Sequence, residues 1–409
     1  MNRAGALSHV RVLDLSRILA GPWATQSLGD LGADIIKVER PGGGDDTRSW
    51  GPPYLADDSN RSAYFCSVNR NKRSLALDLS SEEGARILRQ IAKGSQVLVE
   101  NFKQGGLKRY GLDYESLRQE NPSLVYCSIT GFGQDGPEAA RAGYDFMIQG
   151  MAGLMSVTGE SEGMPMKVGV ALSDVLTGLN AAVAILAALN HAERTGEGQF
   201  IDMSLFDVTV ASLANQAANH LFTGDSPERL GNAHPNIVPY QAFETMDGHV
   251  ILAVGNDAQF KRFCTLAGVP ALAEDERFAT NDGRVRHREA LVPEVAAVMK
   301  TRSMEDWLEA LHREGVPAGP INDIGQAFAE DQARFRDLAT EITDDRGVAV
   351  PIVRSPLRLS ETPPVLHTAP PRVGQHTSEI LTEVVGLGED AIRDLDARGV
   401  ISRIDSAPD

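Results

Sequence analysis

Asp174 is the residue of this chain whose position best suits covalent chemistry. It stands where a short apolar run meets a long stretch rich in Ala, Leu, Ile and Val, which predicts a helix from Asp174 to about Arg194. An aspartate at that point is first of all a helix N-cap, which accepts hydrogen bonds from the free N–H groups of the first turn. The helix dipole and the same donors also keep a carboxylate ionised at neutral pH, and an ionised carboxylate can attack a carbonyl. The position alone leaves a cap and a nucleophile both open.

Basic and amide side chains gather at two places in an otherwise acidic chain. The net charge of −17 argues against nucleic acid as a general partner and requires any anionic ligand to be held by a few placed cations. The loop R-P-G-G-G-D-D-T-R carries Arg40 and Arg48, and the run N-R-N-K-R-S covers residues 69–74. These donors suit phosphate, although a basic run is also typical of a solvated turn.

The elements that must position these residues alternate between strands and helices. Strands are predicted at 10–15, 34–39, 96–100, 124–129 and 199–203, with helices at 21–31 and 80–93. This alternation predicts an α/β domain with a mainly parallel sheet. Asn101 and Phe102 directly follow one of these strands, where such sheets place ligand contacts. No G-x-G-x-x-G follows the first strand, so a dinucleotide site is not indicated.

The chain of 409 residues is too long for one ordinary core, and we predict two domains. Residues 1–222 form the N-terminal part of a large domain, and the Gly, Pro and Asn-rich stretch 223–240 is a linker. Residues 241–325 form a small α+β domain with a hairpin that turns at Asp247 and Gly248. Residues 326–409 return to the large domain through a proline-rich segment at 350–373, expected to be extended over other surface, and two C-terminal helices.

Cysteine and histidine spacing indicates neither a disulfide framework nor a metal site. The three cysteines are far apart without a C-x-x-C pair, and the nine histidines include no H-E-x-x-H. The N-terminal stretch is too short and polar before its first strand for a secretory signal, and no apolar run reaches the length of a membrane span. These features predict a cytoplasmic protein without a membrane segment.

Motifs from both ends of the chain combine into one pattern. They are V-L-D-L-S, A-G-P, L-G-A-D-I-I-K-V-E-R-P-G-G-G-D, N-R-N-K-R-S-L-A-L-D-L, V-E-N-F, G-L-D-Y-E-S-L, S-I-T-G-F-G-Q-D-G-P, V-A-L-S-D-V-L-T-G and H-T-S-E-I-L. This set resembles the class III CoA-transferases, the group of formyl-CoA transferase and carnitine CoA-transferase, to which α-methylacyl-CoA racemase is related.

The resemblance implies a function for Asp174 and for a set of CoA contacts. Asp174 matches the aspartate that becomes acylated and then carries CoA as a thioester, with CoA or acyl-CoA as substrate and no permanently bound cofactor. The implied CoA contacts are Ile18, Ala20, Arg40, Asn71, Lys72, Arg73, Asn101, Phe102, Arg109, Tyr144 and Asp145. The implied fold is a large Rossmann-like domain built from both chain ends plus a small domain, in an interlocked homodimer.

Two departures from the family pattern narrow the expected activity. The related racemases carry a histidine base where this chain has Tyr144, and a phenol is a poor base at pH 7. Leu19 replaces a glutamine of formyl-CoA transferase. The stretch H-P-N-I-V-P-Y-Q resembles the subgroup that transfers CoA from succinyl-CoA to short dicarboxylic acids such as glutarate. A racemase and a non-catalytic acyl-CoA-binding protein remain the alternatives, and the sequence does not identify the acceptor acid or the pathway.

Overall fold

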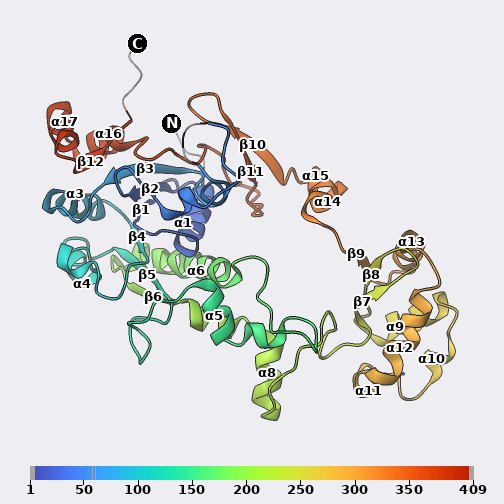
Figure 1. Ribbon diagram of the computed structural model, residues 1–409. Coiled ribbons are helices and arrows are strands. Elements are labelled where there is room, and N and C mark those ends of the chain that lie inside the picture. The colour runs from blue at the N-terminus through green and yellow to red at the C-terminus, as the bar shows by residue number, and fades with distance from the viewer. Residues whose placement is uncertain (1–4, 58, 60, 405–409) are drawn as a thin grey trace. The chain divides into compact units, whose positions relative to one another are not determined.

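The computed structural model describes residues 5–57, 59 and 61–404, and these divide into two compact units (Figure 1). Unit 1 contains Met1–Ala152, Gly169–Ser212 and Gln332–Asp409, and unit 2 contains Gly153–Val168 and Leu213–Asp331. These limits differ from the predicted domain limits, because residues 153–168 belong to unit 2. Arg229 donates hydrogen bonds to the carbonyls of Glu160 and Gly163, and Gly231 N–H donates to Gly159 O, which fastens this segment to its unit.

Unit 1 is built on a seven-stranded sheet with the order β12-β3-β2-β1-β4-β5-β6. Its strands are β1 Arg11–Asp14, β2 Asp34–Glu39, β3 Lys72–Leu77, β4 Val97–Glu100, β5 Val125–Thr130, β6 Phe200–Ser204 and β12 Ile401–Ser402. All neighbouring pairs are parallel except β12 with β3. The order 3-2-1-4-5-6 is that of a doubly wound Rossmann sheet, in which the winding direction reverses between β1 and β4. The predicted mainly parallel α/β sheet is confirmed.

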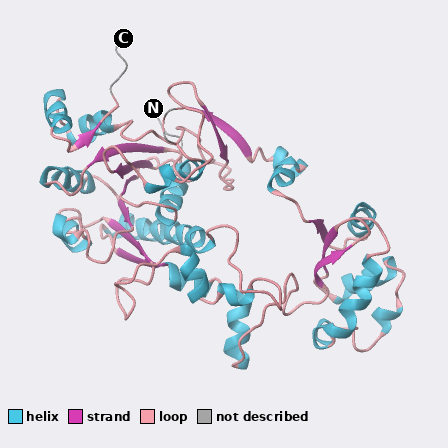
Figure 2. Cartoon of the chain, viewed as in Figure 1, coloured by secondary structure: helices cyan, strands magenta, loops and turns pink. Residues whose placement is uncertain are grey.

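Helices cover both faces of this sheet (Figures 1 and 2). The helices of unit 1 are α1 Ala20–Asp30, α2 Ala63–Ser67, α3 Glu82–Lys93, α4 Tyr114–Leu117, α5 Asp145–Met151, α6 Leu172–Thr195, α7 Leu205–Ala211, α16 Thr377–Ile380 and α17 Glu389–Ala397. Alternate strand residues point to opposite faces. Leu13 and Ile36 pack with α3 and the C-terminal helices, whereas Val12 and Ile35 pack with α1 and α6.

Helix α6 is the one described helix whose length and composition would also suit a membrane span. One side of it is buried against α1 and the sheet through small and branched residues, including Ala181, Ile185 and Ala188. At Gly178 the approach to α1 is so close that a Cβ would lie 2.6 Å from Ala20 O. The buried side of α6 therefore belongs to the core of unit 1, whereas Leu179 and Val183 on another side are exposed.

The return segment runs along the surface of unit 1. It begins with the hairpin of β10 Ala339–Thr343 and β11 Ala349–Val353, which the sequence analysis did not predict. The proline-rich stretch that follows is bonded to the sheet and its helices: Asn71 N–H donates to Thr368 O, and Arg48 donates to Pro371 O. Between β11 and α16 the segment forms no helix or strand.

Unit 2 contains a three-stranded antiparallel sheet with helices around its own apolar core. Its strands are β7 Tyr240–Glu244, β8 His249–Ala253 and β9 Ala318–Pro320. Its helices are α8 Ala214–Thr223, α9 Asp257–Leu266, α10 Ala271–Glu274, α11 Asn281–Arg286, α12 Arg288–Met299, α13 Met304–Arg313 and α14 Ile324–Ala329, and α15 Asp331–Phe335 spans the junction with unit 1. The hairpin β7–β8 confirms the turn predicted at Asp247 and Gly248.

Candidate active site

A cavity of about 700 Å³ lies in unit 1 at the carboxyl ends of the parallel strands. Its walls come from residues that end or follow β1 to β5 and from the first turns of α1, α5 and α6. The cavity includes the point between β1 and β4 where the winding reverses, which is where open α/β sheets bind ligands. The topology therefore makes this cavity the candidate binding site.

Most of the predicted site residues line this cavity. They are Ile18, Ala20, Arg40, Asn101, Phe102, Arg109, Tyr144, Asp145 and Asp174. The structure thus brings the expected nucleophile together with the expected CoA contacts, from segments more than 150 residues apart in the chain.

Asn71, Lys72 and Arg73 do not line the cavity. Each is buried at the beginning of β3 and is held by an acid of a neighbouring element: Asn71 donates to Asp30 at 2.9 Å, Lys72 to Asp14 at 3.1 Å and Arg73 to Asp34 at 2.7 Å. Buried cations need such partners because desolvation of an unpaired charge is costly. The basic run is therefore part of the packing of α1, β1 and β2, neither a solvated turn nor an open anion site.

Of the two roles considered for Asp174, the structure does not show the helix cap. Helix α6 begins at Leu172, so Asp174 lies inside its first turn, and no side chain of the N-cap residue Ala171 caps the helix. Asp145, at the beginning of α5, takes this role instead: its Oδ1 accepts Ser173 N–H at 2.8 Å and Asp174 N–H at 3.3 Å. The carboxylate of Asp174 therefore stays uncommitted, and no described residue donates a hydrogen bond to it.

The expectation that Asp174 is fully ionised at neutral pH is wrong. Burial of its carboxyl, together with the negative charge of Asp145, raises the pKa of Asp174 to about 7. Tyr64 of α2 lies within the field of both acids: burial and the charge of Asp174 raise the pKa of its phenol to about 12. At pH 7 about half of the Asp174 side chains carry the charge that attack on a carbonyl requires.

Arginine and lysine side chains surround the outer part of the cavity. Arg17 and Arg40 both pair with Asp46, at 2.9 Å and 2.5 Å. Lys103 and Arg109 line the cavity without an ion-pair partner among the described residues, and Arg109 lies 4.6 Å from the centre of the Tyr110 ring. These two cations are available to an anionic ligand, and Arg109 has the planar donor geometry that suits phosphate.

The family assignment follows from a sequence model of CoA-transferase family III, which matches residues 7–377. The chain belongs to CoA-transferase family III. It is similar to the succinate–glutarate CoA-transferase of Agrobacterium fabrum (52% identity, 94% of this chain and 96% of the relative) and to the succinyl-CoA:glutarate CoA-transferase of Mus musculus (45%, 97% and 90%). A crystal structure of a CaiB/BaiF family protein from Brucella suis matches with a TM-score of 0.81 at 49% identity, covering 93% of this chain and 99% of that one.

Membership of family III makes this chain an enzyme that uses CoA thioesters as substrates, with no permanently bound cofactor. Among residues 5–57, 59 and 61–404 no group of three or more His, Cys, Asp or Glu side chains could hold a metal ion. The three cysteines are free and buried. The carboxylate of Asp174 lines the cavity and accepts no hydrogen bond from a described residue.

The cavity of this CoA-transferase also contains residues that the sequence analysis missed. Arg17 and Asp46 line the wall next to β1 and β2, and Ser80 lies where the chain leaves β3. The signal for Arg17 and Asp46 was available, because each lies in a loop that follows the carboxyl end of a predicted strand. Tyr64 is not among the residues that line the cavity, but from the short helix α2 between β2 and β3 it lies within the field of Asp174 and Asp145.

Proposed function

We propose that this enzyme moves CoA from succinyl-CoA to a short dicarboxylic acid such as glutarate, with Asp174 as the covalent nucleophile. The observation that carries the proposal is the position of Asp174, whose uncommitted carboxylate lines the cavity at the carboxyl ends of the sheet. Two relatives named for succinate and glutarate, at 52% and 45% identity, support this choice of donor and acceptor.

The reaction begins when the Asp174 carboxylate attacks the thioester carbonyl of succinyl-CoA. The C–S bond breaks, which leaves a succinyl-aspartyl anhydride and the CoA thiolate. The thiolate then attacks the aspartyl carbonyl, releases succinate and forms an aspartyl-CoA thioester. The acceptor carboxylate attacks that thioester to give a second anhydride, and the thiolate takes the acceptor acyl group while Asp174 leaves as carboxylate. Each step exchanges one acyl bond for another, so no co-reactant is needed.

The residues that line the cavity indicate how CoA would lie in it. Arg109 and Lys103 bind its phosphates, because they line the cavity without ion-pair partners in the described chain. Arg17 and Arg40 share the single carboxylate of Asp46, so this group keeps one net positive charge for a phosphate. Ile18, Ala20, Asn101, Phe102 and Tyr144 border the pantetheine arm, and Asp145 holds the helix that carries the nucleophile. Asn71, Lys72 and Arg73 are left out of this site because their side chains are engaged elsewhere.

An interlocked homodimer in the cytoplasm completes the proposal. Several large apolar side chains are exposed in the single chain. Their exposed fractions include 92% for Phe222, 86% for Phe335 and 81% for Leu221. Such side chains suit burial against a second copy. The buried free thiols fit a reducing compartment. Multi-angle light scattering that gave the mass of one chain at micromolar concentration would contradict the dimer.

The test is mass spectrometry of the intact protein after incubation with succinyl-CoA, followed by trapping with borohydride or hydroxylamine and peptide mapping. We expect a modification at Asp174, its loss in Asp174→Asn, and its retention in the control Asp113→Asn, which alters a cap aspartate of α4. An unmodified wild-type protein with succinyl-CoA and with a panel of other acyl-CoAs would refute the proposal. Exchange of the α-proton of a branched acyl-CoA with solvent deuterium would support a racemase instead.

A further inference from the structure

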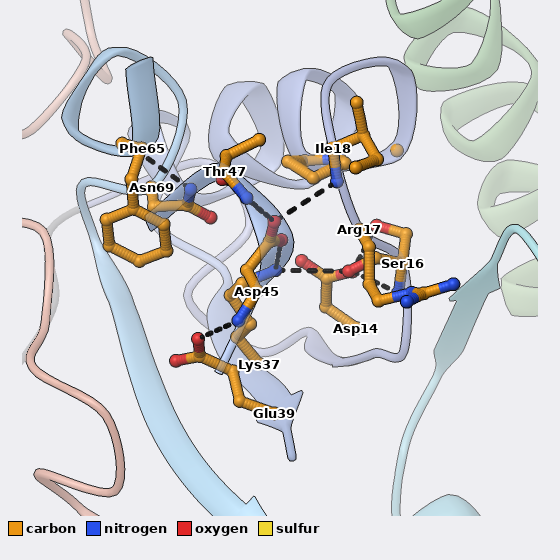
Figure 3. A network of polar contacts seen from close by, with 12 residues as sticks. Asp14, Ser16, Arg17, Ile18, Lys37, Glu39, Asp45, Thr47, Phe65 and Asn69 are labelled. Atoms are coloured by element: carbon orange, nitrogen blue, oxygen red, sulfur yellow. Dashed lines mark hydrogen bonds and ion pairs between the residues drawn. The ribbon is translucent and has the colours of Figure 1, made fainter. Parts of the chain in front are cut away.

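We propose that the buried ion pair of Lys37 and Asp45 is a positioning device for the transferase reaction. It holds the turn between β1 and α1, and with it one wall of the cavity, in a backbone conformation that the turn would not keep by itself. The inference rests on the proposed function only for its catalytic readout. Its structural basis is the set of contacts in Figure 3.

The turn contains a residue in an unfavourable conformation. Ile18 has a φ of +72°, in the left-handed region, and it lines the cavity. A β-branched residue is a genuine outlier there, because its Cβ approaches the following carbonyl oxygen. Such a conformation persists only where the surrounding structure determines it, and it is found preferentially at functional sites.

The ion pair contacts the turn on both sides of Arg17. Lys37 Nζ donates to Asp45 Oδ2 at 2.9 Å and to the carbonyl of Ser16 at 3.0 Å. Asp45 Oδ1 accepts the N–H of Ile18 at 3.4 Å. Asn101 holds the residue in between: its Oδ1 accepts Arg17 N–H at 3.0 Å, and its Nδ2 donates to Arg17 O at 2.7 Å. Every residue from Ser16 to Ile18 thus has a backbone group bound by a side chain of another element.

The pair is itself fixed in place. Thr47 donates to Asp45 Oδ1 through its N–H at 3.0 Å and its hydroxyl at 2.8 Å, and Asp45 N–H donates to Glu39 Oε2 at 2.9 Å. Both side chains of the pair are completely buried. Burial opposes the ionisation of Asp45, but Lys37 and the Thr47 donors outweigh it and lower its pKa to about 2. The pair is therefore charged and rigid throughout the working pH range.

A buried ion pair contributes little net stability, because the desolvation of both charges offsets their attraction. The location of the pair explains its presence better than its contribution to stability does. The turn leads directly into α1, and the first residue of α1, Ala20, lines the cavity. The carbonyl of Ala20 lies against Gly178 of α6, the helix that carries Asp174. A relaxed turn would displace this wall from the nucleophile. Lys37 and Asp45 are thus positioning residues, and their loss should lower kcat more than it raises KM.

The experiment replaces the pair by uncharged side chains in the full-length enzyme. In Lys37→Met/Asp45→Asn we expect kcat with succinyl-CoA and glutarate to fall about 100-fold, while KM for glutarate changes little. Adding Ile18→Gly should restore a large part of kcat, because glycine adopts positive φ without cost. Adding Ile18→Ala should not, because alanine keeps the Cβ. The control Arg70→Met/Asp30→Asn removes another buried pair, which touches neither the turn nor the cavity, and should keep kcat.

Two results would overturn the inference: a folded pair variant with kcat within about twofold of wild type, or equal recovery by glycine and alanine at position 18. If the pair variant does not fold, Thr47→Val serves as a milder change, expected to lower kcat in the same direction and to respond to Ile18→Gly. Urea unfolding supplies a readout without catalysis. If the effects of Ile18→Gly and of the pair replacement on the free energy of unfolding were strictly additive, the pair would not hold the turn. An unmodified Asp174 in wild type would refute only the proposed function.

Discussion

Replacing Asp145 by asparagine should shift the pH dependence of Asp174 acylation to lower pH. Asp145 Oδ1 caps α6 by accepting the N–H groups of Ser173 and Asp174, and an asparagine oxygen can accept the same two bonds. The substitution therefore keeps the cap and removes the negative charge beside the nucleophile. It also loses the hydrogen bond that Asp145 Oδ2 accepts from Gln149 Nε2 at 2.8 Å, because the new Nδ2 is a donor. The change at the nucleophile itself is the electrostatic cost of ionising Asp174.

The size of the effect follows from the pKa of Asp174, which lies at about 7 against an ordinary value of 3.8. This difference of about 3 units corresponds to about 4 kcal/mol in favour of the neutral acid. Burial is the larger cause and the charge of Asp145 the second, so the variant should lower the pKa of Asp174 by a part of this difference. At pH 6 wild type is about one tenth ionised, so the ionised fraction and with it the acylation rate would rise by up to about tenfold. Above pH 8 both enzymes are ionised, so the gain disappears and the wild type is the faster enzyme, because its more basic carboxylate is the stronger nucleophile.

The assay is single-turnover acylation by succinyl-CoA in rapid-quench experiments from pH 5 to pH 9. The control is Asp113→Asn, which removes a charge from another helix cap that does not affect Asp174. Circular dichroism at each pH would show that the α6 cap survives. A midpoint for Asp145→Asn that stays at the wild-type value, or moves to higher pH, would refute the electrostatic coupling of the two acids.

Two further predictions concern the same helix. The folded-state pKa of Asp174 is raised above its unfolded value, so its contribution to stability is complete below about pH 4 and is lost as the pH rises through about 7. Asp174→Asn should therefore be more stable than wild type at pH 8.5, by at most about 4 kcal/mol before solvent screening, and urea unfolding that gave the same difference at pH 4 and 8.5 would contradict this. Gly178→Ala should destabilise the fold by about 1–3 kcal/mol, because the new Cβ would lie 2.6 Å from Ala20 O and 2.9 Å from Trp23 Cβ. The control Gly43→Ala, where the new Cβ would meet nothing within 4 Å, should have little effect on the thermal midpoint.

The sheet and the place of the site were predictable because both depend on local patterns. The strand predicted at 34–39 coincides with β2, and those at 96–100 and 124–129 differ from β4 and β5 by one residue at most at each end. Asn101 and Phe102 were expected at the end of a parallel strand, and both line the cavity. A run of buried strand residues identifies the sheet, and the carboxyl ends of its strands identify the site, without knowledge of any tertiary contact.

The basic run at 69–74 shows where such reasoning fails. The local excess of positive charge was equally compatible with a phosphate site and with buried ion pairs. The acids that neutralise Lys72 and Arg73 lie on β1 and β2, 58 and 39 residues away in the chain. Only the parallel pairing of β2 with β3 brings Arg73 and its partner together. The sequence shows how many cations of a segment need an anionic partner. Whether that partner is a ligand or a carboxylate of the protein depends on the order of the strands in the sheet.

The capping of α6 explains why Asp174 does not serve as a helix cap. A helix N-terminus needs an acceptor, and local sequence offered Asp174 for this role. The structure uses Asp145 instead, 29 residues earlier in the chain, and this exchange has two chemical consequences. It releases the Asp174 carboxylate from hydrogen bonding, which leaves its lone pairs available for attack. It also sets a second negative charge beside it, which raises its pKa and makes the ionised carboxylate a stronger base and nucleophile than an ordinary aspartate. The cap that Asp145 provides thus leaves the Asp174 carboxylate without hydrogen-bond donors and also raises its pKa, and the proposed reaction depends on both effects.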